Sequence, residues 1–313
     1  MKKAFVFLLG LVLFHQSASA QSIWFAPRAG RERPADYMDL FKPDAPWPQA
    51  ASHVKVFELS QRMAAAGSET ELRQIFSNLR DRHIGLCVGV LPLSAGPDGC
   101  GQGVEGYSAP GQSLHDAKRI QALGADVAAF ALDEPLHFGH AFQGTKQLTP
   151  CHSPIDDIAR QVALRVQQIR TVYPNAQVGD VEPFPGSDSW LAELEQWFEA
   201  YHKATGEKLA FFRLDMAWDR PWRERIPALV ELLHREGIPL QVIYNGNGRA
   251  ATDEEWIAQA LSHAAEFESQ GRPTPDVVCI QCWTPKPSKL LPETDPKTLT
   301  SLINQYVAQK TRK

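Results

Sequence analysis

Short apolar runs alternate with segments of helical period along the chain from residue 21 onward. Runs rich in β-branched and aromatic residues predict strands. The predicted strands cover residues 23–26, 54–59, 84–91, 127–132, 177–181, 209–215, 240–245 and 277–283. A helical segment follows most of them, which is typical of a parallel sheet with crossover helices.

Several of the helical segments carry their own start and stop signals. Ser68 with a glutamate three residues later forms a capping box ahead of an apolar stripe, and Thr252 opens a second box. Ser153 is expected to cap a helix that begins with a proline. Gly237 supplies the left-handed residue that ends the helix before the seventh strand.

Eight strand and helix units in a chain of this length favour one closed barrel, so the predicted fold is α/β, a single-domain (β/α)8 TIM barrel over residues 21–313. An open doubly wound sheet usually carries a Gly-rich phosphate loop after its first strand. Residues 26–30 read Ala-Pro-Arg-Ala-Gly and lack that pattern. The first crossover, residues 31–52, has only a short helical stretch at 37–41 and is expected to be irregular.

The first twenty residues have the order of a signal peptide. Two lysines precede an apolar run over residues 4–14, and Ala18-Ser19-Ala20 forms a small-x-small cleavage site. The apolar run is shorter than the roughly 20 residues of a membrane-spanning helix. We therefore expect cleavage after Ala20, a periplasmic or secreted protein, and no membrane association afterwards.

The charge of the chain excludes some classes of binding partner. The net charge is -4 and the chain has no basic block that would follow a phosphate backbone, so nucleic acid is not an expected partner. Nucleotide cofactors are scarce outside the cytoplasm, and no cofactor is expected.

Cys100 and Cys151 both lie in Gly/Pro-rich loops and are predicted to form a disulfide. A monomer is expected.

In a TIM barrel the active site lies at the C-terminal ends of the strands, so the residues that close each strand predict its lining. This ring consists of Arg28, Glu58, Asp133, Glu134, Asp180, Glu182, Arg213, Asp215, Tyr244, Asn245, Asn247, Gln281 and Trp283.

The ring is rich in carboxylates, which suits acetal hydrolysis. One protonated group donates to the leaving oxygen while an ionised group attacks or activates water. Glu134 is the predicted acid, Glu182 its leading partner and Asp215 the next candidate. A proline follows each glutamate, and we expect it to end the strand and hold the glutamate at the rim. Asp133 completes the catalytic set.

Flat aromatic rings at the same rim suit the apolar face of a sugar. Trp218, Tyr244 and Trp283 are the predicted sugar contacts, with Trp283 under the sugar at the cleavage point. The other predicted substrate-binding residues are Arg28, Glu58, Asp180, Arg213, Asn245 and Gln281.

With this layout and these rim motifs, the mature chain resembles the (β/α)8 glycoside hydrolases. Their largest clan closes strand four with Asn-Glu and strand seven with a nucleophilic Glu, whereas in this chain the corresponding residues are Asp133-Glu134 and Tyr244-Asn245. The adjacent Asp-Glu pair looks more like that of the substrate-assisted hexosaminidases. That resemblance implies that Asp133 orients an acetamido group, that Glu134 is the acid and that Tyr244 donates a hydrogen bond. Strand alternation would separate Asp133 from Glu134 unless the strand ends between them.

The carbohydrate interpretation has two alternatives. A metal-dependent barrel isomerase or hydrolase could use Glu134, Glu182, Asp215 and His137, but the first strand has no His-x-His and no metal is expected. A barrel of the cell envelope could also bind glycan without cleaving it.

Overall fold

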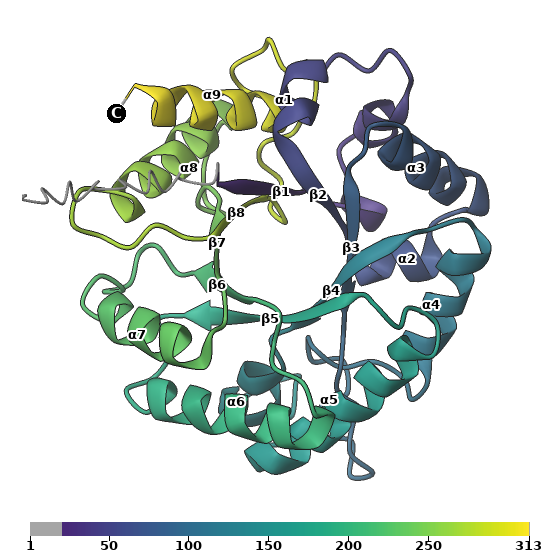
Figure 1. The fold of residues 1–313 in the computed structure, drawn as a ribbon, viewed down its shortest axis with the longest axis vertical. Helices are drawn as coiled ribbons and strands as arrows, with labels where there is room; N and C mark the ends of the chain where they lie inside the picture. Colours follow the sequence, from purple (N-terminus) through teal and green to yellow (C-terminus); the bar gives the residue numbers. More distant parts are fainter. Residues whose placement is uncertain (1–20, 313) are drawn as a thin grey trace, which may run out of the picture.

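The computed structural model describes residues 21–312, so the predicted signal peptide, residues 1–20, lies outside the described residues. Within that range eight parallel strands close into a barrel in chain order, which confirms the predicted TIM barrel. Figure 1 looks into this barrel. The strands are β1 (Ser22–Ala26), β2 (Val54–Leu59), β3 (Gly85–Val90), β4 (Val127–Asp133), β5 (Gln177–Phe184), β6 (Phe212–Met216), β7 (Leu240–Tyr244) and β8 (Val277–Gln281).

Helices surround the barrel as an outer ring (Figure 1). They are α1 (Pro48–His53), α2 (Gln61–Ala66), α3 (Glu69–Asp81), α4 (Gln112–Ala122), α5 (Ile155–Arg170), α6 (Trp190–Thr205), α7 (Ile226–Glu236), α8 (Asp253–Phe267) and α9 (Leu299–Thr311). Shorter turns are η1 (Gly30–Glu32), η2 (Tyr37–Phe41) and the π-helical η3 (His137–Ala141). The crossover from β1 to β2 consists of η1, η2 and the short α1, so it is irregular as predicted.

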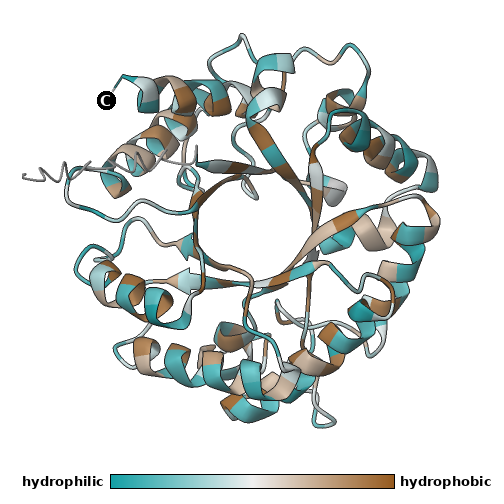
Figure 2. Cartoon of the chain, in the orientation of Figure 1, coloured by the Kyte–Doolittle hydropathy of each residue, from teal (hydrophilic) through white to brown (hydrophobic). Residues whose placement is uncertain are grey.

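The strands separate two apolar cores. In Figure 2 much of the barrel ribbon is brown, the colour of hydrophobic residues. The larger core lies between the barrel and the helices, and the smaller one fills the barrel interior. Inside the barrel the large rings of Trp24 and Phe211 meet edge to face at 5.2 Å, while β4 contributes only alanines. A Cβ on Gly179 would lie 2.4 Å from the Phe211 ring, so the interior fits only with glycine there.

Most of the predicted helix signals hold. Ser68 and Glu71 form the capping box of α3, and Gly237 ends α7 with φ of 69°. The predicted second box is half formed, because Thr252 accepts the N–H of Glu255 while the Glu255 side chain binds the N–H of Ala251. The expected Ser153 cap is wrong. Pro154 is the N-cap residue of α5, and no side chain caps the helix, because Ser153 lies one residue too early.

Strand β5 is longer than predicted, and this changes the site. The sequence predicts that proline ends the strand soon after Val181, but β5 continues through Pro183 to Phe184 and pairs Pro183 with Asp215 of β6. Glu182 therefore lies within a strand, where alternation of side chains decides which face it occupies.

Two further features bear on the sequence predictions. The Cys100–Cys151 disulfide is present, with an S–S distance of 2.08 Å, and it joins the loop after β3 to the loop after β4. Among residues 21–312, no helix has the length and apolarity to cross a membrane.

Candidate active site

Inward-pointing side chains continue the barrel interior up to its C-terminal mouth. Ala129 and Ala131 of β4 belong to the interior core, so the next residue in that alternation, Asp133, also points inward. Phe211, immediately before β6, is interior, and Asp215 of β6 follows it in the same alternation. Both carboxyl groups thus face the mouth from neighbouring parts of the wall, and both keep a small solvent-exposed fraction.

The backbone turns sharply at the residue that follows β4. Strand β4 ends at Asp133, and Glu134 has a φ of 50°, in the left-handed region that costs a non-glycine residue about 1 kcal/mol or more. This turn interrupts the alternation, so Glu134 does not point away from Asp133. The carboxyl groups of both residues belong to one electrostatic cluster.

The carboxyl groups of Glu134 and Asp215 lie close enough for each to shift the pKa of the other. Burial raises the pKa of Glu134, and the charges of Asp215 and Asp133 raise it further, to about 10. Burial also raises the pKa of Asp215, but the hydrogen bond from Glu134 opposes this, and the value is about 6. With these pKa values Glu134 is protonated and Asp215 is ionised at neutral pH.

Two further carboxyl groups act on this pair. Burial raises the pKa of Asp133 to about 7, with further increases from the charges of Glu105 and Glu58. Arg62, at the start of α2, opposes that rise. Glu105 also raises the pKa values of Glu134 and Asp215, so its charge reaches all three inward groups.

The sequence analysis missed Glu105, which lies in the long loop after β3. Gly106 holds this loop against the end of β4, where a Cβ on the glycine would lie 3.1 Å from the Asp133 carbonyl oxygen. The Gly106 carbonyl accepts the N–H of Leu93, and the Cys100–Cys151 disulfide ties the loop to its neighbour. The only available signal was the predicted disulfide, which implies that both loops lie over the same edge of the barrel.

A polar layer lies deeper in the barrel, below the carboxyl cluster. Arg213 is fully buried, and its Nη1 lies 2.5 Å from Glu58 Oε2 while its Nε donates to Gln241 at 2.9 Å. Its guanidinium lies over the rings of Trp24 and Phe211. Arg213 and Glu58 were predicted as substrate contacts, but the structure places them as an ion pair inside the barrel.

Two predicted carboxylates of β5 face away from the mouth. Val181 is an interior residue, so Asp180 and Glu182 on either side of it point outward, toward the helices. Asp180 accepts the indole N–H of Trp197 on α6, and Glu182 accepts backbone N–H groups of the turn after β4. The expectation that Glu182 and Asp180 line the cleft is therefore corrected: Asp180 faces outward by strand alternation, and Glu182 does so because β5 continues past Pro183.

Tyr244 also points outward from the barrel. Its hydroxyl donates to Glu268 at 2.9 Å, and its ring packs beside Phe267 and Tyr306 in the helix layer. The predicted role as a hydrogen-bond donor to substrate is corrected, because the neighbouring Asn245, and not Tyr244, follows the inward alternation from Ile243.

Asn245 is held at the mouth by two aromatic residues. Trp218 donates its indole N–H to Asn245 Oδ1 at 2.8 Å and stacks on His263 with ring centroids 4.5 Å apart. His263 Nδ1 lies 2.8 Å from the Asn245 carbonyl oxygen. With Oδ1 occupied by Trp218, the amide Nδ2 of Asn245 is the group that is free to donate to a bound molecule.

We expect Trp218→Phe to raise KM by about tenfold, the effect of losing one well-placed hydrogen bond, with a smaller change in kcat. Phenylalanine keeps the stacking on His263 but cannot fix the Asn245 amide. Trp222→Phe is the matched control, because among the described residues the buried Trp222 indole N–H has no hydrogen-bond partner to lose. Equal KM values for both variants would argue against this role of Trp218.

Three predicted contacts, Arg28, Gln281 and Trp283, lie at the ends of β1 and β8, on the other side of the mouth. Trp283 has 45% of its surface exposed, an unusual exposure for tryptophan in this protein. Gln281 Oε1 lies 3.5 Å from the Cys279 thiol, and Arg28 is partly buried. These three residues stay candidate substrate contacts.

The residues of the metal alternative are not brought together. Both oxygens of Glu182 bind backbone N–H groups behind β5, away from Glu134 and Asp215. Burial lowers the pKa of His137, and Arg220 lowers it further. In the part of the chain that the structure describes, no three His, Cys, Asp or Glu side chains are grouped to hold a metal ion.

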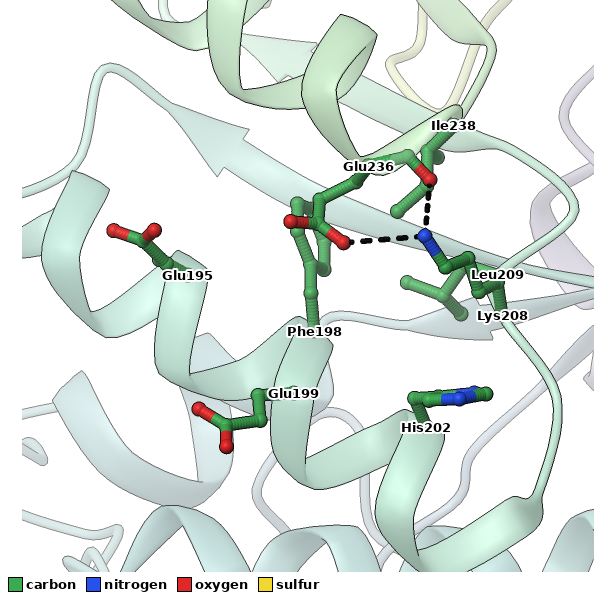
Figure 3. Close-up of a pocket in the computed structure, with 8 residues that line it drawn as sticks. All are labelled: Glu195, Phe198, Glu199, His202, Lys208, Leu209, Glu236 and Ile238. Atoms are coloured by element: carbon green, nitrogen blue, oxygen red, sulfur yellow. Dashed lines mark hydrogen bonds and ion pairs between the residues drawn. The ribbon is translucent and has the colours of Figure 1, made fainter.

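A pocket at the opposite end of the barrel holds none of the predicted site residues. Figure 3 shows it between α6, α7 and the starts of β6 and β7, where Lys208 binds the carbonyl oxygen and the carboxylate of Glu236. Its lining residues belong to helix surfaces and strand starts, a region that carries stability rather than catalysis in TIM barrels.

Comparison with solved structures shows the same fold in other proteins. A GH10 protein from Paenibacillus barcinonensis is similar with a TM-score of 0.52 and 14% identity, over 84% of this chain and 83% of that chain. A xylanase from Cellvibrio japonicus, Xyn10A, gives a TM-score of 0.49 and 10% identity, over 84% of this chain and 86% of that one. An HpcH/HpaI aldolase from Desulfitobacterium hafniense gives a TM-score of 0.42 and 9% identity, over 93% and 92%.

This similarity shows that the chain shares the (β/α)8 barrel fold with the GH10 protein. Comparison of the sequence with models of protein families and with curated proteins gives no match. At such low identities, the chemistry has to be inferred from the residues at the mouth of this barrel.

Proposed function

We propose that this chain is an exported glycoside hydrolase that cleaves O-glycosyl bonds in a poly- or oligosaccharide. The observation that carries the proposal is the pair of buried carboxyl groups at the C-terminal mouth, Glu134 and Asp215, which shift each other's pKa. One protonated and one ionised carboxyl group facing a common cleft is the chemical requirement of glycoside hydrolysis.

In the proposed reaction Glu134 gives its proton to the leaving oxygen as the glycosidic bond breaks. Carboxyl groups about 6.5 to 9.5 Å apart leave room for a water molecule, whereas groups about 5 to 5.5 Å apart favour direct attack by the second carboxylate. Two carboxyl groups that shift each other's pKa as strongly as Glu134 and Asp215 fit the shorter separation. Asp215 therefore bonds to the anomeric carbon, and a water molecule, deprotonated by Glu134, then releases the sugar with its configuration retained.

The remaining mouth residues supply binding. The exposed Trp283 offers a ring on which a sugar can stack, and Asn245 offers an amide donor. Asp133 and Glu105 supply acceptors for sugar hydroxyl groups. The disulfide and the predicted signal peptide fit a protein that meets a polymeric substrate outside the cytoplasm.

A screen for reducing ends tests this function. The purified mature chain is incubated with a panel of polysaccharides that includes amino-sugar polymers, and released sugars are measured together with their anomeric configuration. We expect reducing ends from at least one polymer, with retained configuration. Binding of an oligosaccharide without any release would support the glycan-binding alternative, and activity lost on chelation would support the metal-dependent one.

The pH profile gives a separate prediction. Activity requires Asp215 ionised and Glu134 protonated. Because the pKa of Asp215 is about 6, kcat/KM should fall as the pH drops below about 6, and because the pKa of Glu134 is about 10, it should fall again above about 10. The measurement is kcat/KM on one substrate from about pH 4 to about pH 11. An optimum below roughly pH 5 would contradict the raised pKa of Asp215.

A further inference from the structure

Glu182 of β5 holds the start of the helical turn that follows Glu134. Its Oε1 accepts the N–H of Leu136 at 2.6 Å, and its Oε2 accepts the N–H of His137 at 3.0 Å. These are among the first N–H groups of the turn, which have no partner within the turn itself. The Glu182 side chain is fully buried, so water does not compete for them.

The same turn fixes the backbone of Glu134. The Glu134 N–H donates to the Val181 carbonyl of β5 at 3.0 Å, and the Glu134 carbonyl accepts the N–H of Phe138 at 2.9 Å. Glu134 has a left-handed φ, a conformation that persists only where the surroundings hold it. Glu182 binds the two residues between these contacts, so β5 holds both ends of the strained segment.

The neighbouring Asp180 shows which buried carboxyl group of β5 carries the charge. Burial raises the pKa of both groups, and each negative charge disfavours the other. Both oxygens of Glu182 already accept backbone N–H groups. Asp180 accepts one bond, from Trp197, and among the described residues its Oδ1 has no partner. The geometry therefore places a proton more readily on Asp180 Oδ1 than on Glu182, whose two oxygens both face N–H donors.

We propose that Glu182 is a positioning residue that acts on Glu134 from behind the barrel wall. Its carboxylate caps the turn over residues 135–138 and thereby directs the Glu134 carboxyl group toward Asp215. The proposal rests on the proposed function insofar as Glu134 is the acid of the reaction.

The interaction of the two glutamates is visible in their titration. Glu134 is among the groups whose charge raises the pKa of Glu182, and electrostatic coupling of this kind is mutual. Loss of the Glu182 charge should lower the pKa of Glu134. Loss of the cap should lower it as well, because a displaced Glu134 no longer donates to Asp215.

The matched variants are Glu182→Gln and Asp180→Asn, two conservative changes on the same face of the same strand. Glutamine places an NH2 group against a backbone N–H, so one capping bond is lost together with the charge. Asparagine keeps the acceptor for Trp197 and replaces a group that is already neutral. Two quantities are measured for each full-length mature variant. One is the pKa of Glu134, followed by NMR of its carboxyl carbon and assigned with Glu134→Gln, and the other is kcat and KM on the cleaved substrate.

For Glu182→Gln we expect the pKa of Glu134 to fall by about one unit or more, with kcat about 100-fold lower and KM within about twofold of wild type. Asp180→Asn should change neither the pKa nor kcat. An unchanged pKa of Glu134 in folded Glu182→Gln overturns the proposal, even if the variant is less stable. If Glu182→Gln does not fold, Glu182→Asp decides in the same way, because its shorter side chain keeps the charge but cannot reach both N–H groups.

The NMR measurement separates this proposal from the proposed function. If the wild type cleaves no glycan, the hydrolase assignment fails. The pKa of Glu134 in Glu182→Gln still supports or overturns the positioning role.

Discussion

Glu134→Gln should lower kcat for glycoside cleavage by about 10³-fold, in the range that a positioned general acid contributes. Glutamine keeps the size of the side chain and can still donate to Asp215, but it has no proton to give to the leaving oxygen. KM should change little, because the mouth keeps its shape. Reducing-end release under single-turnover and steady-state conditions measures the effect.

Asp215→Asn should be at least as damaging, because asparagine cannot form the bond to the anomeric carbon. The double variant should be about as active as the worse single variant, since two residues of one mechanism are not additive. Glu199→Gln, an exposed glutamate on α6 at the far pocket, is the control and should keep wild-type kcat. A wild-type rate in Glu134→Gln would remove Glu134 from the chemistry.

Most of the fold follows from local patterns. Each strand is a short buried run, the helices carry caps and stripes, and a closed barrel is the arrangement that buries all eight runs. The positions of Asp133, Glu134 and Asp215 follow from the rule that barrel strands end at the active site. This rule names a ring of residues, but it does not say which side of the wall each one occupies.

The wrong predictions for site residues concern the side of the barrel wall on which each residue lies. Alternation along a strand is reliable only when the strand end is known, and Pro183 does not end β5 as its sequence position predicts. Because the strand continues to Phe184, Glu182 moves from the cleft to the helix side. Neighbouring residues of a strand face opposite sides, so Asn245 lies at the mouth and Tyr244 lies on the helix side of the wall.

Glu105 could not be predicted as a site residue for a different reason. It comes from the middle of an irregular loop, and its position depends on Gly106 packing against Asp133 and on a disulfide 51 residues apart in sequence. Long-range contacts of this kind leave no periodic signal. Buried Arg213 is similar, because its partner Glu58 lies 155 positions earlier in the chain.

The buried ion pair of Arg213 and Glu58 inside the barrel affects the stability of the fold. Arg213 brings a permanent charge into a site with no bulk water, and Glu58 is its only carboxylate partner among the ion pairs of residues 21–312. Trp24 and Phe211 stabilise the guanidinium with their ring faces, but ring faces do not replace a counter-charge. The pair lies directly beneath the carboxyl cluster, so its loss would affect folding before chemistry.

Glu58→Gln should therefore lower the free energy of unfolding by about 3 to 5 kcal/mol, the usual cost of leaving one member of a buried ion pair without its partner. Glutamine can accept one hydrogen bond from Arg213, but it leaves the positive charge uncompensated in the barrel. Denaturant unfolding followed by tryptophan fluorescence measures the change. The double variant Glu58→Met with Arg213→Met is the control. It removes both charges and fills the interior with apolar groups, so it should be more stable than Glu58→Gln. A change below about 1 kcal/mol in Glu58→Gln would mean that water reaches Arg213 and that this layer belongs to the substrate cavity, as the sequence pattern alone indicates.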